Sequence, residues 1–69
     1  RTLVLVPTRE LAVQVGQVMH PVSDGLGLKV VVAHGGVSIN PQMMALRGGA
    51  DVVVATTGRL LDLVAHNAL

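Results

Sequence analysis

The segment VLVPTRELA, from Val4 to Ala12, joins an apolar run to a helix-like pattern through a proline. Thr8, Arg9 and Glu10 stand together at this junction, although charged residues make up only 13% of the chain. Two further valine-rich runs follow. Continuous apolar runs of this kind are typical of strands in a parallel sheet that is covered on both faces. The three expected strands are TLVLV (2–6), KVVVAH (29–34) and DVVVAT (51–56).

The segments between and after these strands have the apolar spacing of helices. The first helix should be kinked or ended early by Pro21 and should stop at the group DGLG (24–27). The second should have Asn40 as its N-cap, begin at Pro41 and end at Gly48-Gly49. The predicted buried stripes are Leu11, Val15, Val18 and Val22 in the first helix, Met43, Met44 and Leu46 in the second, and Leu60, Leu61, Val64 and Ala65 in the third.

The alternation of strands and helices predicts an α/β fold, with three βα units of a parallel sheet. Strands joined by crossover helices run parallel, so all three should end at the same edge of the sheet. Ligands of open α/β sheets bind at this carboxyl edge. We expect residues 1–69 to be a single incomplete domain, because the chain lacks an initiator methionine and both ends fall inside structural patterns.

Three short polar turns follow the strands at that edge: Pro7-Thr8-Arg9-Glu10, His34-Gly35-Gly36 and Thr56-Thr57-Gly58-Arg59. A helix N-terminus presents free N–H groups and a partial positive charge, which attract anions. Threonine hydroxyls and arginine guanidinium groups bind phosphate, and a Gly-Gly pair lets another backbone approach closely. Together the turns predict binding of a nucleic-acid backbone without reading of its bases. Taken singly, the same residues are explained as helix caps, surface arginines and a plain turn.

The composition argues against several other kinds of site. The net charge is +1, so a basic nucleic-acid-binding tail is not indicated, and without Phe, Tyr or Trp there is no aromatic platform for bases. Because there is no cysteine and the histidines (His20, His34 and His66) are far apart in sequence, no metal site is expected. No apolar run approaches the roughly 20 residues of a membrane-spanning helix. These features fit a cytoplasmic protein with no membrane partner.

The turn residues also match a known family. PTRELA (7–12), the Gly35-Gly36 pair and VVATTGRLLDL (53–63) resemble motif Ia, the GG motif and motif Ib of DEAD-box RNA helicases. The similarity runs over essentially all 69 residues and implies the central part of the first RecA-like domain. It further implies a parent enzyme that uses ATP and Mg²⁺, binds single-stranded RNA between two RecA-like domains of one chain, and separates short duplexes locally.

The resemblance assigns roles by position. Glu10 and Thr57 would be positioning residues, with Arg59 as the expected partner of Glu10. Thr57 stands where the family usually has proline, and we expect it to cap its helix by itself. No catalytic residue is expected, because the chain has neither a Gly-x-x-x-x-Gly-Lys-Ser/Thr loop nor paired acids for Mg²⁺, so this segment alone should bind no cofactor and hydrolyse no ATP. The residues implied in RNA-backbone binding are Pro7, Thr8, Arg9, Gly35, Gly36, Thr56, Gly58 and Arg59.

Of three other interpretations, the first is not supported by its motif and the other two stay open. A dinucleotide-binding enzyme needs Gly-x-Gly-x-x-Gly between a strand and a helix, whereas Gly25-Leu26-Gly27 precedes a strand and lacks the third glycine. An α/β fragment could use its threonines and arginines only as helix caps and bind nothing. A DNA helicase of the same superfamily would have similar turns, because the choice of RNA depends on 2′-OH contacts that these residues do not reveal.

Overall fold

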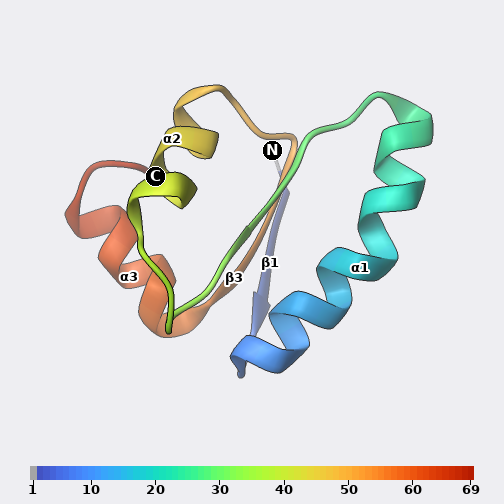
Figure 1. Cartoon of the computed structure of the whole chain (residues 1–69). Helices are drawn as coiled ribbons and strands as arrows, with labels where there is room; N and C mark the ends of the chain where they lie inside the picture. Colours follow the sequence, from blue (N-terminus) through green and yellow to red (C-terminus); the bar gives the residue numbers. More distant parts are fainter. Residues whose placement is uncertain (1) are drawn as a thin grey trace.

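The computed structural model describes residues 2–69. Within this range three parallel strands alternate with three helices, as Figure 1 shows. The predicted α/β fold is therefore confirmed, although Lys29, His34 and Asp51 lie just outside the strands. In chain order the elements are β1 (Thr2–Val6), α1 (Arg9–Leu26), β2 (Val30–Ala33), α2 (Asn40–Arg47), β3 (Val52–Thr56) and α3 (Thr57–Ala65).

The sheet has the order β1-β3-β2, with β3 in the centre and both pairings parallel. Val54 of β3 lies beside Val4 of β1 and beside Val32 of β2. Because the strands run in one direction, they end together at the carboxyl edge, as the sequence predicts. The turns that follow all three strands therefore start from the same side of the sheet.

Helices cover both faces of the sheet, and this explains the continuous valine runs. Val53 and Ala55 of β3 belong to the apolar cluster under α2 and α3, whereas Val54 belongs to the cluster under α1. All three side chains are almost completely buried. A strand with core on both faces has no solvent side on which to place polar residues.

Helix α1 is not ended early by Pro21. It continues through Pro21 to Leu26, and Gly27, in the left-handed conformation with φ at 71°, ends it. The predicted early end at Pro21 is therefore wrong, while the stop within residues 24–27 is confirmed. Pro21 lies on the exposed side of the helix, where water can bond to the carbonyl group that the proline leaves without a partner.

The buried stripe predicted for α1 is also wrong. Three of its four members are exposed: Leu11, Val18 and Val22. The buried residues of α1 are small: Ala12, Gly16 and Ser23. Val15 and Met19 are partly buried and pack against the same cluster. A Cβ atom at Gly16 would lie 2.6 Å from Val32 Cγ2, so α1 lies too close to β2 for larger side chains. Packing distance, which the spacing of apolar residues does not encode, selects the buried side.

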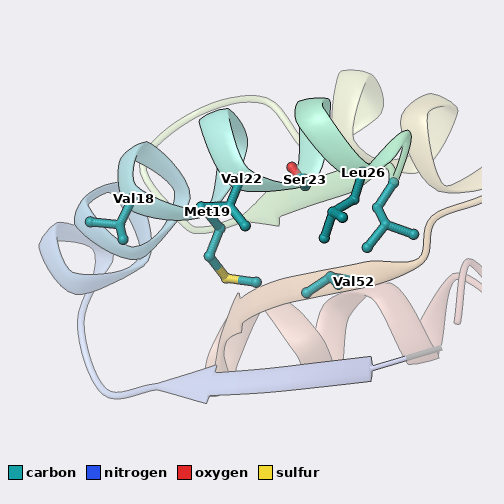
Figure 2. Close-up of a pocket in the computed structure, with 7 residues that line it drawn as sticks. Val18, Met19, Val22, Ser23, Leu26 and Val52 are labelled. Atoms are coloured by element: carbon teal, nitrogen blue, oxygen red, sulfur yellow. The ribbon is translucent and has the colours of Figure 1, made fainter.

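The larger apolar residues of α1 instead border an open groove. Figure 2 shows Met19, Val22 and Leu26 reaching from the helix toward Val52 of β3. The groove contains no charged side chain. Its lining residues are Val18, Met19, Val22, Ser23, Leu26, Leu28 and Val52.

Helix α2 begins one residue earlier than predicted, so the prediction that Asn40 is its N-cap is wrong. Its N-cap is Ile39, and the N–H group of Asn40 donates to Ser38 Oγ at 3.4 Å. Leu46 is buried and Met43 packs against the core, as predicted, whereas Met44 is exposed. The helix ends at Gly48, again as predicted.

Helix α3 contacts the core mainly through Leu63, which the predicted stripe left out. Leu63 is fully buried and Leu60 packs against the same cluster. Because residues three apart lie on one side of a helix, this pair defines the contact with the sheet. The other predicted members of the stripe are exposed: Leu61, Val64 and Ala65. None of the helices within residues 2–69 is long and apolar enough to cross a membrane.

Candidate nucleic-acid interface

The first turn joins β1 to α1 and is capped by a side chain. Thr8 is the N-cap, with φ at −136° and ψ at 155°, and its Oγ1 accepts from the N–H group of Leu11 at 3.2 Å. The hydroxyl hydrogen remains available as a donor to an outside group. Glu10 lies in the first turn of α1, where a carboxylate interacts favourably with the helix dipole.

The second turn follows β2 and is built around Gly36. Its φ is +83°, in the left-handed region that residues with a side chain rarely adopt. The guanidinium group of Arg9 lies where a Cβ atom of Gly36 would be. Gly36 is therefore needed both for the backbone conformation and for the approach of Arg9 from the end of β1.

The third turn joins β3 to α3 and differs from its prediction. Thr56 is the N-cap and makes no side-chain capping bond, while Thr57 is the first helical residue. The prediction that Thr57 caps the helix is therefore wrong, because a capping side chain belongs to the residue before the helix. Gly58 lies in the first turn of α3, and a Cβ atom there would meet no other atom of residues 2–69 within 4 Å.

Arg59 points from α3 toward the glycine turn. Its Nη2 donates to the carbonyl oxygen of Val37 at 3.1 Å, and its Nη1 donates to Gln42 Oε1 at 3.3 Å. Its Nε lies 3.9 Å from Asp62 Oδ2, and its side chain is only 10% exposed. The predicted pair with Glu10 is wrong, because Glu10 starts α1 on one face of the sheet and Arg59 belongs to α3 on the other.

Both arginines thus reach the turn after β2 from opposite faces of the sheet. Arg9 contacts Gly36, and Arg59 bonds to Val37. The three turns predicted to share one rim do lie together. We call the residues of these turns, 7–10, 34–37 and 56–59, the carboxyl rim.

In the glycine turn, the carbonyl groups of His34, Gly35 and Val37 have donors. The His34 carbonyl accepts from Gln42 Nε2 at 3.1 Å, and the Gly35 carbonyl lies 2.9 Å from His34 Nδ1, which must carry the proton. In the described part of the chain, the N–H groups of Gly35, Gly36 and Val37 have no hydrogen-bond acceptor. Adjacent free N–H groups beside two guanidinium groups form a site suited to an anion.

The one lysine lies away from the rim, whereas His34 belongs to it. Lys29 lies at the opposite end of β2, where its N–H group donates to Asp51 Oδ2 and its Nζ donates to the Ala45 carbonyl, both at 2.8 Å. His20 and His34 line one cleft beside β2, although they are distant in sequence. Among residues 2–69 no three His, Cys, Asp or Glu side chains are grouped to hold a metal ion.

Gln42 of α2 contacts the rim and was not among the residues predicted from the sequence. Its side chain is buried, and it contacts both His34 and Arg59. A signal was present, because Gln42 and the predicted core residue Leu46 are four apart and share one helix face. A polar residue on the buried face of a helix needs polar partners.

All 69 residues match the family model described as DEAD/DEAH box helicase. The DEAD-box ATP-dependent RNA helicase 5 of Arabidopsis thaliana is 49% identical over 67 residues, which cover 97% of this chain and 12% of that protein. A hypothetical ATP-dependent RNA helicase from Sulfolobus tokodaii superposes with a TM-score of 0.88 at 40% identity. The yeast DEAD-box splicing factor Prp28 superposes at 0.89 with 34% identity. Both structures match 99% of this chain, which covers 20% and 16% of theirs.

Proposed function

Because the chain belongs to the DEAD/DEAH box helicase family, we propose that it is the central part of the first RecA-like domain of an ATP-dependent RNA helicase. Its carboxyl rim binds the sugar–phosphate backbone of single-stranded RNA. The observation that carries this proposal is the glycine turn, where the N–H groups of Gly35, Gly36 and Val37 have no acceptor among the described residues. A phosphate oxygen of the RNA would accept hydrogen bonds from these N–H groups. The proposed contacts are Pro7, Thr8, Arg9, Gly35, Gly36, Thr56, Gly58 and Arg59.

The rim residues have different proposed roles, some in binding phosphate and others in holding the turns in place. Arg9 is exposed and lies against Gly36, so its guanidinium can bind a phosphate that also meets the free N–H groups of the turn. Thr8 offers its hydroxyl hydrogen beside it. Arg59 is mostly buried and bonded to Val37, so it acts mainly by holding the turn in place. Glu10 and Thr57 support the starts of the two helices.

No step of ATP hydrolysis runs through these 69 residues. They include no Gly-x-x-x-x-Gly-Lys-Ser/Thr loop and no paired acids, so the groups that hold ATP and Mg²⁺ would come from other parts of the parent enzyme. This segment contributes a surface that binds the phosphate groups of the RNA backbone and makes no contact with the bases. Binding should therefore be tolerant of sequence and should weaken as salt rises.

Gly58→Ala tests the proposal, because it should weaken RNA binding without lowering the stability of the fold. Glycine costs about 1 kcal/mol in a helix, and the added methyl group meets no atom of the described residues. In the helicase domain that contains this segment, the variant should unfold at equal or higher urea concentration. It should nevertheless bind RNA more weakly, because the methyl group occupies the surface on which the backbone lies.

Fluorescence anisotropy with labelled oligouridine and oligoadenosine at two salt concentrations measures the binding. Arg9→Ala should weaken it roughly ten-fold. Arg47→Ala is the matched control, since Arg47 is exposed at the far end of α2. Unchanged affinity in both rim variants, or a strong preference for one oligonucleotide, would refute the proposal. Equal binding of DNA of the same sequence would favour a DNA helicase.

A further inference from the structure

Gln42 lies outside all three motifs, yet its side-chain amide joins two of them. It is buried, with 8% exposure, on the side of α2 that faces β2. Its Nε2 donates to the His34 carbonyl at the start of the glycine turn, and its Oε1 accepts from Arg59 Nη1. We infer that Gln42 is a positioning residue for RNA binding by the carboxyl rim, an inference that rests on the proposed function.

The chemistry of the two contacts requires an amide. A guanidinium group only donates and a carbonyl oxygen only accepts, so the side chain between them must accept at one end and donate at the other. The amide orientation observed is the one in which both contacts are attractive. A carboxylate would face the His34 carbonyl with a second acceptor, and an apolar side chain of the same length would satisfy neither partner.

The two bonds tie together both ends of the glycine turn. Arg59 holds the Val37 carbonyl after the turn, and Gln42 holds the His34 carbonyl before it. Because Arg59 also bonds to Gln42, the two ends form one hydrogen-bonded unit. Gly35 and Gly36 lie between these fixed points, so the direction of their free N–H groups depends on Gln42. Loss of the amide would leave buried polar groups unpaired, and the turn would shift to reach water.

Two variants of the helicase that contains this segment test the inference. Gln42→Met keeps the length and packing but removes both bonds, and Gln42→Glu keeps only an acceptor for Arg59. Each should weaken RNA binding roughly five-fold, the effect of about one buried hydrogen bond. The RNA concentration that half-stimulates ATP hydrolysis should rise by the same factor. The kcat at saturating RNA and the KM for ATP should stay within about two-fold, which is the mark of a positioning role.

Two controls complete the experiment. Gln14→Met makes the same change at an exposed glutamine of α1 and should leave RNA binding unchanged. In an Arg59→Ala background, Gln42→Met should add little, because residues that act as one unit are not additive. Full additivity would overturn the inference.

The reference variant Arg9→Ala separates the two ideas. If Arg9→Ala weakens RNA binding and both Gln42 variants bind like the wild type, the inference is overturned and the proposed function stands. If the Gln42 variants instead lose kcat and ATP affinity together with thermal stability, Gln42 is a general structural residue and the inference is again overturned. If even Arg9→Ala binds RNA normally, both ideas fail.

Discussion

The turns that begin α1 and α3 are alike in sequence and different in use. Each places a threonine before the helix and an arginine in its first turn. In the first, the Thr8 side chain caps the helix and Arg9 is exposed against Gly36. In the second, Thr56 makes no side-chain capping bond and Arg59 is mostly buried. An arginine in the first turn of a helix can thus present its charge in one turn and hold a loop in the other, although Arg9 is the first residue of α1 and Arg59 the third of α3.

The two faces of the sheet account for the difference. Helix α3 shares its face with α2, which supplies Gln42 as a partner for Arg59. Helix α1 stands alone on the other face among the described residues, so Arg9 has only the glycine turn beside it. The same isolation leaves the groove of Figure 2 open along α1. Whether a neighbouring helix supplies a hydrogen-bond partner therefore decides whether the arginine at a helix start is buried or exposed.

The largest effect should come from exchanging the two arginines for alanine. Arg59→Ala leaves Gln42 Oε1 and the Val37 carbonyl without their donor, so it should lower the free energy of unfolding by about 2 kcal/mol. Arg9→Ala should change it by less than about 0.5 kcal/mol, as is usual at an exposed position. Urea denaturation of the helicase domain measures both. If Arg9→Ala and Arg59→Ala lowered the free energy of unfolding equally, the two arginines would have the same structural role and the comparison would fail.

The threonines should differ in the same experiment by a smaller amount. Thr8→Ala removes the hydroxyl that caps α1 and should cost about 1 kcal/mol, whereas Thr56→Ala removes no capping bond. Thr8→Ser keeps the hydroxyl and should recover most of the loss. If Thr56→Ala proved as costly as Thr8→Ala, its hydroxyl would have a structural role that the capping geometry does not explain.

Thr57→Pro should have the smallest effect on stability. It tests the turn that begins α3 by restoring the proline usual in the family. Thr56 has φ at −76° and ψ at 152°, the extended conformation that proline requires of the residue before it. Thr57 is the first helical residue, where proline is favoured. The variant should gain about 0.5 kcal/mol of stability and bind RNA within two-fold of the wild type.

Thr57→Ala is the control for this variant, since it removes the hydroxyl without adding a ring. A loss of stability in Thr57→Pro but not in Thr57→Ala would mean that the N–H group of Thr57 has a partner in the folded helicase. In that case the family proline and this threonine would not be interchangeable. The turn between β3 and α3 would then depend on a backbone hydrogen bond that its capping geometry does not show.

Local sequence determined much of this segment. The valine runs predicted all three strands, Thr8 predicted the start of α1, and Gly27 and Gly48 predicted where α1 and α2 end. These features depend on residues close together in the chain, through turn geometry, capping and the pattern of side chains on a strand. Parallel crossovers then place the three turns on one edge, so the location of the rim also follows from sequence.

Tertiary structure alone decided how that edge is built. The buried side of α1 depends on the close approach of Gly16 to Val32, and the partners of Arg59 depend on α2 and α3 lying on the same face. Gln42 takes part because the sheet order brings β2 beside β3. Distances between a helix and a sheet, and the order of strands, are set by residues far apart in the chain. No local pattern carries that information, so the arginine that holds the turn looks, in sequence, like the arginine that is free.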